Sequence, residues 1–244
     1  GSTVSSGTVS ETRNGSDAST PPLSGFLASL RTARSAAIGG IIFSILFSVV
    51  LIMFRLAFPY EKLLDPNYLP PEGSISSANL ALALVPYAGI AFIWFMAAIN
   101  YNLGAADNRL FSTVFIGSGI LFTAIIFVAA AFGAAEINAL AQGFDTSGAA
   151  RVIPGVAVNK LLLDYAARMA SVFTLSLSAF GRSRKALPTW LTAIGTIAGL
   201  FLFLVPVGVP YVEFVFPVWV SLLSVYLFVT HPRRMLHPQA PAQG

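Results

Sequence analysis

Six apolar segments, each long enough to cross a lipid bilayer, limit how this chain can fold. At 1.5 Å of helix per residue, runs of about 19–26 residues cross the roughly 30 Å hydrocarbon layer of a membrane. The sequence therefore predicts an all-α fold, a polytopic transmembrane helix bundle with six spans. The expected spans are about 36–58, 79–101, 110–135, 156–180, 188–206 and 211–230.

Composition and charge agree with an integral membrane protein and argue against a nucleic-acid partner. Hydrophobic residues make up 56% of the 244 residues and charged residues 10%, whereas about 25% of residues are charged in soluble proteins. The net charge of +4 comes from basic residues at the ends of apolar segments, with no basic block. This distribution fits orientation in a bilayer better than binding to nucleic acid.

The distribution of Lys and Arg predicts which way the bundle faces. Six spans place both chain ends on one side, and this side holds nine basic residues against four on the other. The nine are Arg13, Arg31, Arg34, Arg109, Arg182, Arg184, Lys185, Arg233 and Arg234, and the four are Arg55, Lys62, Arg151 and Lys160. Because cytoplasmic loops carry the basic excess, we expect both termini to be cytoplasmic. The expected parts are a disordered tail at 1–30, a membrane domain at 31–232 and a second tail at 233–244.

Small residues recur at every fourth position of the first span, at Ala36, Gly40, Ser44 and Ser48. Gly195 and Gly199 repeat this spacing in the fifth span. Such stripes let helix backbones approach closely in a membrane. Packing within the chain is the favoured interpretation, and a dimerisation face is the alternative. The expected partners are membrane lipids together with a membrane protein or a second copy of the chain.

The fourth span carries charged residues into the membrane. At 100° per residue, one polar stripe covers roughly a third of its circumference. Its members are Asp164, Arg168, Ser171, Thr174 and Ser178. We expect the stripe to face protein or water rather than lipid. If the span begins near residue 156 on the outer side, Asp164 lies about 12 Å deep and Arg168 about 18 Å deep.

Two interpretations of Asp164 and Arg168 stay open at this point. An unpaired Arg at this depth costs a few kcal/mol or more, and an acid four residues before it lowers that cost through an ion pair. In the functional interpretation, Arg168 anchors an anionic ligand or a lipid headgroup and Asp164 holds it in place. In the structural interpretation, the pair is a buried pin that fixes the helix register.

Several other polar residues reach a similar depth in the outer half, as counted along their spans. They are Arg55, Glu136, Glu213, Tyr87 and Tyr211. With Asp164, Arg168 and Ser171 they are candidates for a ligand-binding vestibule. The alternative is that each is a helix-end residue that meets water.

The sequence lacks the signatures of common catalytic sites. Its two histidines, His231 and His237, lie in the basic C-terminal region, and it has no cysteine. These features exclude a histidine-based triad, an HExxH zinc site and thiolate chemistry in the membrane. No Walker loop or GxGxxG motif is present either. We therefore expect a non-enzymatic protein with no cofactor and no metal.

Three stretches carry a resemblance to a known group of proteins. They are Arg168–Ser178, Arg184–Gly195 and the Phe-Pro-Val-Trp motif at Phe216–Trp219. Through them the chain is similar, over roughly residues 31–230, to uncharacterised six-helix membrane proteins of actinobacteria and related bacteria, in a broad family known as a domain of unknown function. The resemblance implies a bacterial inner-membrane location and no assigned activity.

The function these features favour is that of an accessory or structural subunit of a larger membrane assembly. Small-residue faces, the lack of catalytic groups and short cytoplasmic loops support it. The alternative is a small-molecule or lipid carrier with its site around Asp164 and Arg168. The polar stripe and the kinks expected at Pro86 and Pro217 support this alternative.

Overall fold

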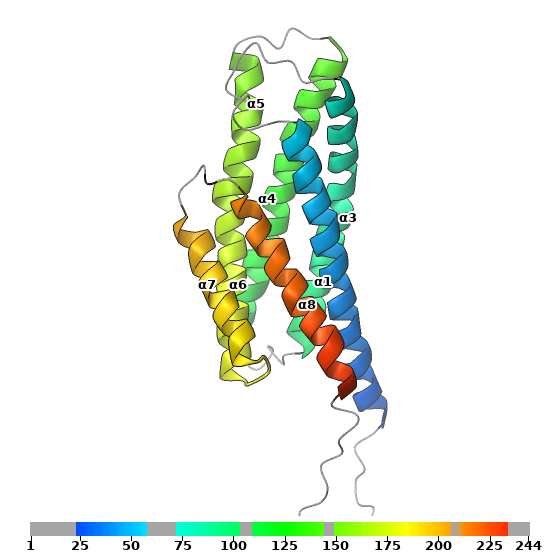
Figure 1. Cartoon of the computed structure of the whole chain (residues 1–244), viewed down its shortest axis with the longest axis vertical. Helices are drawn as coiled ribbons and strands as arrows, with labels where there is room; N and C mark the ends of the chain where they lie inside the picture. The colour runs from blue at the N-terminus through cyan, green and yellow to red at the C-terminus, as the bar shows by residue number, and fades with distance from the viewer. Residues whose placement is uncertain are drawn as a thin grey trace, which may run out of the picture.

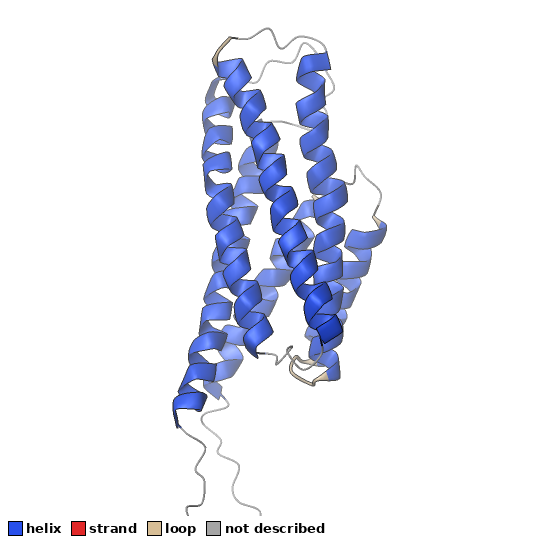
Figure 2. Ribbon diagram, turned by 180° about the vertical axis from the view of Figure 1, so that it is seen from behind, coloured by secondary structure: helices blue, strands red, loops and turns tan. Residues whose placement is uncertain are grey.

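A computed structural model describes residues 23–57, 72–102, 109–143, 149–205, 209 and 211–233. Within these residues the chain is helical and has no strand (Figure 1, Figure 2). This confirms the predicted all-α fold. The elements are α1 (Leu23–Ala57), α3 (Glu72–Asn102), α4 (Arg109–Ala141), α5 (Ala149–Asn159), η2 (Lys160–Ala166), α6 (Ala167–Ser183), α7 (Thr189–Leu204), η3 (Val212–Phe214) and α8 (Val215–Arg233).

The helices form an elongated bundle in which each long helix runs opposite to the one before it (Figure 1). α1 packs along α3 and α8, α4 packs against α3 and α6, and α7 packs mainly against α6. α5, η2 and α6 follow one another directly and form one rod (Figure 1). The start of α1 and the end of α8 lie at the same end of the bundle, which we call the terminal end; the opposite end is the distal end (Figure 1).

Several helices extend beyond the predicted spans. α1 begins at Leu23 rather than near 36, so residues 23–30, which we expected in the N-terminal tail, are helical. α3 begins at Glu72 rather than near 79, and α4 ends at Ala141 rather than near 135. Apolarity marks the part of a helix that can lie in lipid, whereas the helix itself continues as long as its backbone hydrogen bonds do.

Four helical segments are long and apolar enough to cross a membrane, which indicates a membrane protein. They are Arg34–Leu56, Gly73–Tyr101, Leu110–Ala141 and Val212–Thr230. The other two expected spans differ from the prediction. The fourth is helical, but it widens into a π-helix over Lys160–Ala166. The fifth, α7, has 16 residues, and a helix of that length, about 24 Å, is shorter than the roughly 30 Å hydrocarbon layer.

Of the two prolines expected to kink helices, one lies inside a helix and the other in the first turn of a helix. α3 continues through Pro86 as a single helix that ends at Asn102. Pro217 lies in the first turn of α8, where proline is tolerated and does not break a helix. The kink expected at Pro217 was therefore wrong.

Five phenylalanines from five helices meet in the bundle and form what we call the phenylalanine core. They are Phe43 of α1, Phe92 of α3, Phe122 of α4, Phe173 of α6 and Phe216 of α8. Ring centroids are 4.7 Å apart for Phe43 and Phe92, 5.1 Å for Phe92 and Phe173, and 4.8 Å for Phe122 and Phe216. All five side chains are at most 3% exposed. α7 contributes no ring to this core and lies outside it.

Small residues make the close approaches between helices, as the spacing predicted. A Cβ added at Gly40 of α1 would lie 2.8 Å from the ring of Phe95 in α3 and would also clash with Ser224 of α8. A Cβ at Gly199 of α7 would lie 2.7 Å from Leu175 of α6. The small-residue stripes in these two helices therefore pack within the chain, which confirms the favoured interpretation.

Candidate functional site

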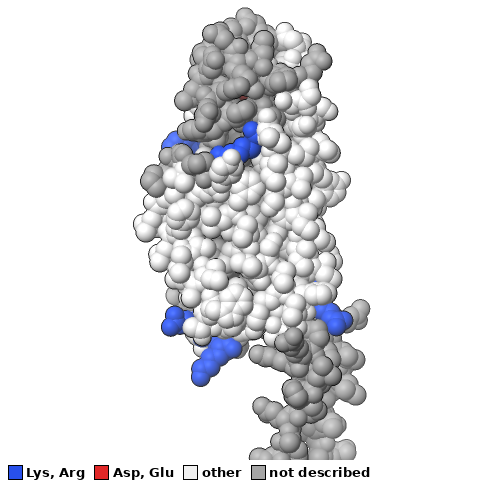
Figure 3. Space-filling model, in the orientation of Figure 1, with Lys and Arg blue, Asp and Glu red and all other residues white. Residues whose placement is uncertain are grey.

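Charged side chains gather at two levels of the bundle. On the face drawn in Figure 3, Lys and Arg lie at both levels, and the band between them carries no charge. α1 has no charged residue between Arg34 and Arg55, a stretch of about 31 Å of helix that matches the thickness of the hydrocarbon layer. The candidate site lies at the distal level. Its charged residues, which we call the ion-pair layer, are Arg55, Lys160, Asp164, Arg168 and Glu213.

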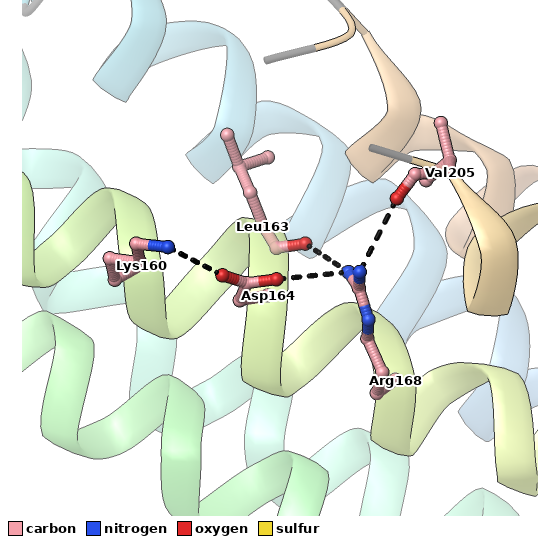
Figure 4. Close-up of polar contacts among 5 residues, drawn as sticks. All are labelled: Lys160, Leu163, Asp164, Arg168 and Val205. Carbon is pink, nitrogen blue, oxygen red and sulfur yellow. Dashed lines mark hydrogen bonds and ion pairs between the residues drawn. The ribbon is translucent and has the colours of Figure 1, made fainter. Parts of the chain in front are cut away.

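The predicted pair in the fourth span is formed. Nη1 of Arg168 lies 3.2 Å from Oδ1 of Asp164, one helical turn away (Figure 4). The other carboxylate oxygen of Asp164 lies 2.9 Å from Nζ of Lys160, a second cation that we did not predict as a partner (Figure 4). The side chains of Asp164 and Arg168 are 23% and 29% exposed, whereas that of Lys160 is 56% exposed. A single carboxylate therefore pairs with one partly buried cation and one exposed cation, and the three residues keep a net charge of +1.

Arg168 also binds two backbone carbonyls of its own chain (Figure 4). Its Nη1 donates to the carbonyl of Leu163 at 3.2 Å, within the π-helical η2. Its Nη2 donates to the carbonyl of Val205 at 3.3 Å. Val205 is the residue that follows the last turn of α7, where unpaired carbonyls and the negative end of the helix dipole favour a cation. Arg168 therefore joins α6 to the end of α7.

The rest of the polar stripe also faces α7 and the interior. Ser171 is fully buried, and its hydroxyl donates to the carbonyl of Gly199 in α7 at 2.7 Å. Thr174 and Ser178 are at most 1% exposed. The stripe thus faces protein rather than lipid, as predicted. Two of its side chains, Arg168 and Ser171, donate to carbonyls at or near the end of α7.

A second ion pair joins α1 to the start of α8. Nη1 of Arg55 lies 3.1 Å from Oε1 of Glu213. The Arg55 guanidinium also stands 4.2 Å above the ring centre of Tyr211, an arrangement that stabilises a cation. Tyr211 has the left-handed backbone conformation, with φ of 65°, and precedes η3, which positions Glu213. The structure therefore brings together three of the residues considered for a vestibule, and their role in binding a ligand stays a prediction.

A small cavity separates the two groups of the ion-pair layer. Its volume is about 50 Å³, and Arg55, Glu213 and Asn159 line it together with Leu51, Phe54, Leu162 and Leu163. Oε2 of Glu213 is buried and makes no hydrogen bond with the described residues. A cavity of this size admits water, whereas pockets for small organic ligands are usually 300–1,000 Å³.

Of the residues predicted for a vestibule, Arg55 and Glu213 line this cavity and the other six do not. Tyr87 is 64% exposed on the outer face of α3, while its neighbours Val85 and Ala88 are buried. Glu136 is 8% exposed in α4 and is not among the described residues that line the cavity. Depth along a helix was the basis of the prediction, and it cannot tell which way a side chain points around the helix.

The site offers few groups for a cofactor. Among the described residues, no group of three or more His, Cys, Asp or Glu side chains could hold a metal ion. The arrangement pairs opposite charges inside the bundle and caps the C-terminal end of α7 through Arg168.

The fold and the site together define a helical membrane protein with a distal layer of ion pairs. Comparison with protein-family models, with curated proteins and with solved structures finds no match for the chain. The resemblance to six-helix actinobacterial membrane proteins therefore stays a prediction.

Proposed function

We propose that the protein is a non-enzymatic accessory or structural subunit of a larger assembly in a bacterial inner membrane. In this proposal its chain crosses the membrane six times and both termini face the cytoplasm, in agreement with the excess of basic residues at the terminal end. The partner is another membrane protein or a second copy of the chain.

The observation that carries the proposal is the use of the polar stripe to hold α7. Arg168 and Ser171 donate to carbonyls of Val205 and Gly199, and Asp164 neutralises Arg168. The guanidinium of Arg168 and the hydroxyl of Ser171 are therefore engaged within the chain. This favours the structural interpretation of the stripe over an anion-binding one.

α7 supplies the surface through which such a subunit could associate. It packs mainly on α6, and large apolar side chains cover its outer face. Their exposed fractions are 68% for Ile197, 47% for Leu200, 45% for Phe201, 49% for Phe203 and 72% for Leu204. A helix shorter than the bilayer is also driven toward association with other helices. Both features favour a partner at α7.

Site-specific crosslinking in native membranes tests the proposal. A photo-crosslinking residue at Ile197 of α7 should give the same adduct in repeated mild-detergent purifications. The matched control is Leu121 of α4, which is 53% exposed and should give the adduct weakly or not at all. The double substitution Ile197→Ala with Leu204→Ala should lower recovery of the partner without lowering the melting temperature, because both side chains are exposed. A clean monomer with no adduct at Ile197 would contradict the proposal.

A second candidate function, a small-molecule or lipid-binding carrier, has one observation in its favour, but it requires the cavity of about 50 Å³ to widen, because that volume admits only water. Arg55 and Glu213 border a cavity, and Oε2 of Glu213 is buried without a hydrogen bond among the described residues. In this alternative the ligand-binding site lies at Arg55 and Glu213, and not at Asp164 and Arg168 as the sequence predicted. Glu213→Gln should then abolish transport or ligand binding while the protein remains folded. Unchanged transport would exclude the carrier.

A further inference from the structure

A groove on the terminal half of the bundle has no role in the proposed function. It lies on the outer face of α3 beside α1 and has a volume of about 480 Å³. Its wall is formed by Ile90, Ile93, Trp94, Ala97 and Tyr101 of α3, with Ser35 of α1 at its edge. The α3 residues recur at helical spacing, so they form one continuous stripe. Ala97 and the buried Ala98, the smallest of the α3 residues that line the groove, lie at the hollow.

The length and position of the groove match one leaflet of a membrane. From Ile90 to Tyr101 the helix rises about 16 Å, close to half of the roughly 30 Å hydrocarbon layer. Tyr101 is 67% exposed next to the last residue of α3, and Trp94 is 61% exposed two turns earlier. An exposed Tyr at a helix end is typical of the boundary between lipid tails and headgroups, and Trp94, about 10 Å farther along the helix, then lies at the level of the acyl chains.

A positive charge lies at the boundary end of the groove. Arg34 is exposed and directly precedes the groove residue Ser35. None of the three ion pairs found among the described residues includes Arg34. Arg182, Arg184 and Lys185 are also exposed at the terminal end. This end therefore carries positive charge where a phospholipid phosphate would lie.

We propose that the groove is a binding site for an anionic phospholipid of the leaflet at the terminal end. One acyl chain lies along the stripe from Ile90 to Tyr101, over Ala97. The phosphate binds the guanidinium of Arg34, whose planar donors suit phosphate oxygens, and the Tyr101 hydroxyl lies at the same level. A partner helix of about 10 Å diameter would also cover the stripe, but Arg34, which forms no ion pair with the described residues, favours an anionic occupant.

Quenching of Trp94 fluorescence by lipids with brominated acyl chains tests the site directly. The full-length protein is reconstituted in phosphatidylcholine vesicles that contain brominated phosphatidylglycerol or brominated phosphatidylcholine. Because the chain has three Trp residues, the signal of Trp94 is the difference between the wild type and Trp94→Phe. We expect brominated phosphatidylglycerol to quench Trp94 at an about fivefold lower mole fraction than brominated phosphatidylcholine, the selectivity that one basic residue provides.

Matched variants distinguish lipid binding in the groove from a general attraction of anionic lipid to the basic residues at the terminal end. Arg34→Gln should remove the preference for phosphatidylglycerol, whereas Arg182→Gln, at an exposed basic residue outside the groove, should retain it. Ala97→Leu should fill the hollow and reduce the lipid adducts seen by native mass spectrometry. If Ala97→Leu lowers the melting temperature, the quenching data from Arg34→Gln decide alone.

Three results would overturn the lipid site. The first is equal quenching by the two brominated lipids. The second is an equal loss of preference in Arg34→Gln and Arg182→Gln, which would mean that the whole basic end attracts anionic lipid. The third is a dimer that Ala97→Leu dissociates, because the groove would then be covered by a second copy.

Discussion

The phenylalanine core and the ion-pair layer hold parts of the same bundle together by different physical means. In the core, five buried rings from α1, α3, α4, α6 and α8 pack with centroids as close as 4.7 Å. In the ion-pair layer, an ion pair joins α1 to η3 at the start of α8, and Arg168, paired with Asp164, donates a hydrogen bond from α6 to the end of α7. Rings gain dispersion energy over many contacts, whereas charges first lose their hydration. The core should therefore supply the stability, and the layer should fix which helix ends meet.

Phe92→Ala should have the largest effect, because Phe92 contacts rings from α1, α4, α6 and α8. In a soluble core such a change costs about 3–5 kcal/mol. Lipid is as apolar as the core, so the transfer part of this loss is largely absent and the cavity part remains. We expect the free energy of unfolding in mixed detergent micelles to fall by about 2–3 kcal/mol. Phe228→Ala in α8, where the side chain is 49% exposed, is the control, and an equal loss there would show that ring packing does not hold the bundle.

Gly195→Ala should have the next largest effect, because Gly195 lies where α7 packs against α6 and α8, outside the phenylalanine core. Its new Cβ would lie 2.7 Å from Nε1 of Trp219 and would clash with Ser178. Overpacking of this kind costs about 1–3 kcal/mol. Gly117→Ala in α4 is the matched control, because nothing lies within 4 Å of its new Cβ. Equal melting temperatures for the two variants would refute close packing of α7 against α6 and α8.

Asp164→Asn tests the ion-pair layer, and we expect a smaller loss of about 1–2 kcal/mol. Breaking a fully buried pair costs about 3–5 kcal/mol, but Asp164 and Arg168 are 23% and 29% exposed. The variant leaves both Lys160 and Arg168 without a carboxylate. Arg168→Met should cost less than Asp164→Asn, because Lys160 still neutralises Asp164. The reverse order of stability, measured by detergent unfolding, would mean that the contacts of Arg168 with the carbonyls outweigh the ion pairs.

The sequence allowed the core of the candidate site to be predicted because local geometry decides it. Residues four apart on a helix must be neighbours, so the contact between Asp164 and Arg168 followed from spacing alone. The inward face of the stripe followed from the cost of exposing charge to lipid. Lys160 also lies four residues from Asp164, and the same rule would have identified it.

Other features depended on the path of the chain and could not be predicted. Val205 accepts from Arg168 through its backbone, and a carbonyl carries no signal in the sequence. The chain has 20 phenylalanines, and no local pattern distinguishes the five that meet in the core. Tyr87 points outward from α3, because counting residues along a helix does not fix the direction of a side chain around it.

The smallest expected effect is that of Arg168→Lys, which keeps the charge but changes its shape. The guanidinium reaches Asp164, Leu163 and Val205 at once, whereas an ammonium is a point charge without this planar fork. Lysine should stay paired with Asp164 and release the carbonyl of Val205. We therefore expect an unchanged melting temperature but faster hydrogen exchange in the last turn of α7, at Phe201–Leu204. Arg182→Lys at the terminal end should leave that exchange unaltered. If Arg168→Lys also leaves it unaltered, then Ser171 and close packing alone hold α7, and the ion-pair layer has no part in positioning the helix that we assign to partner binding.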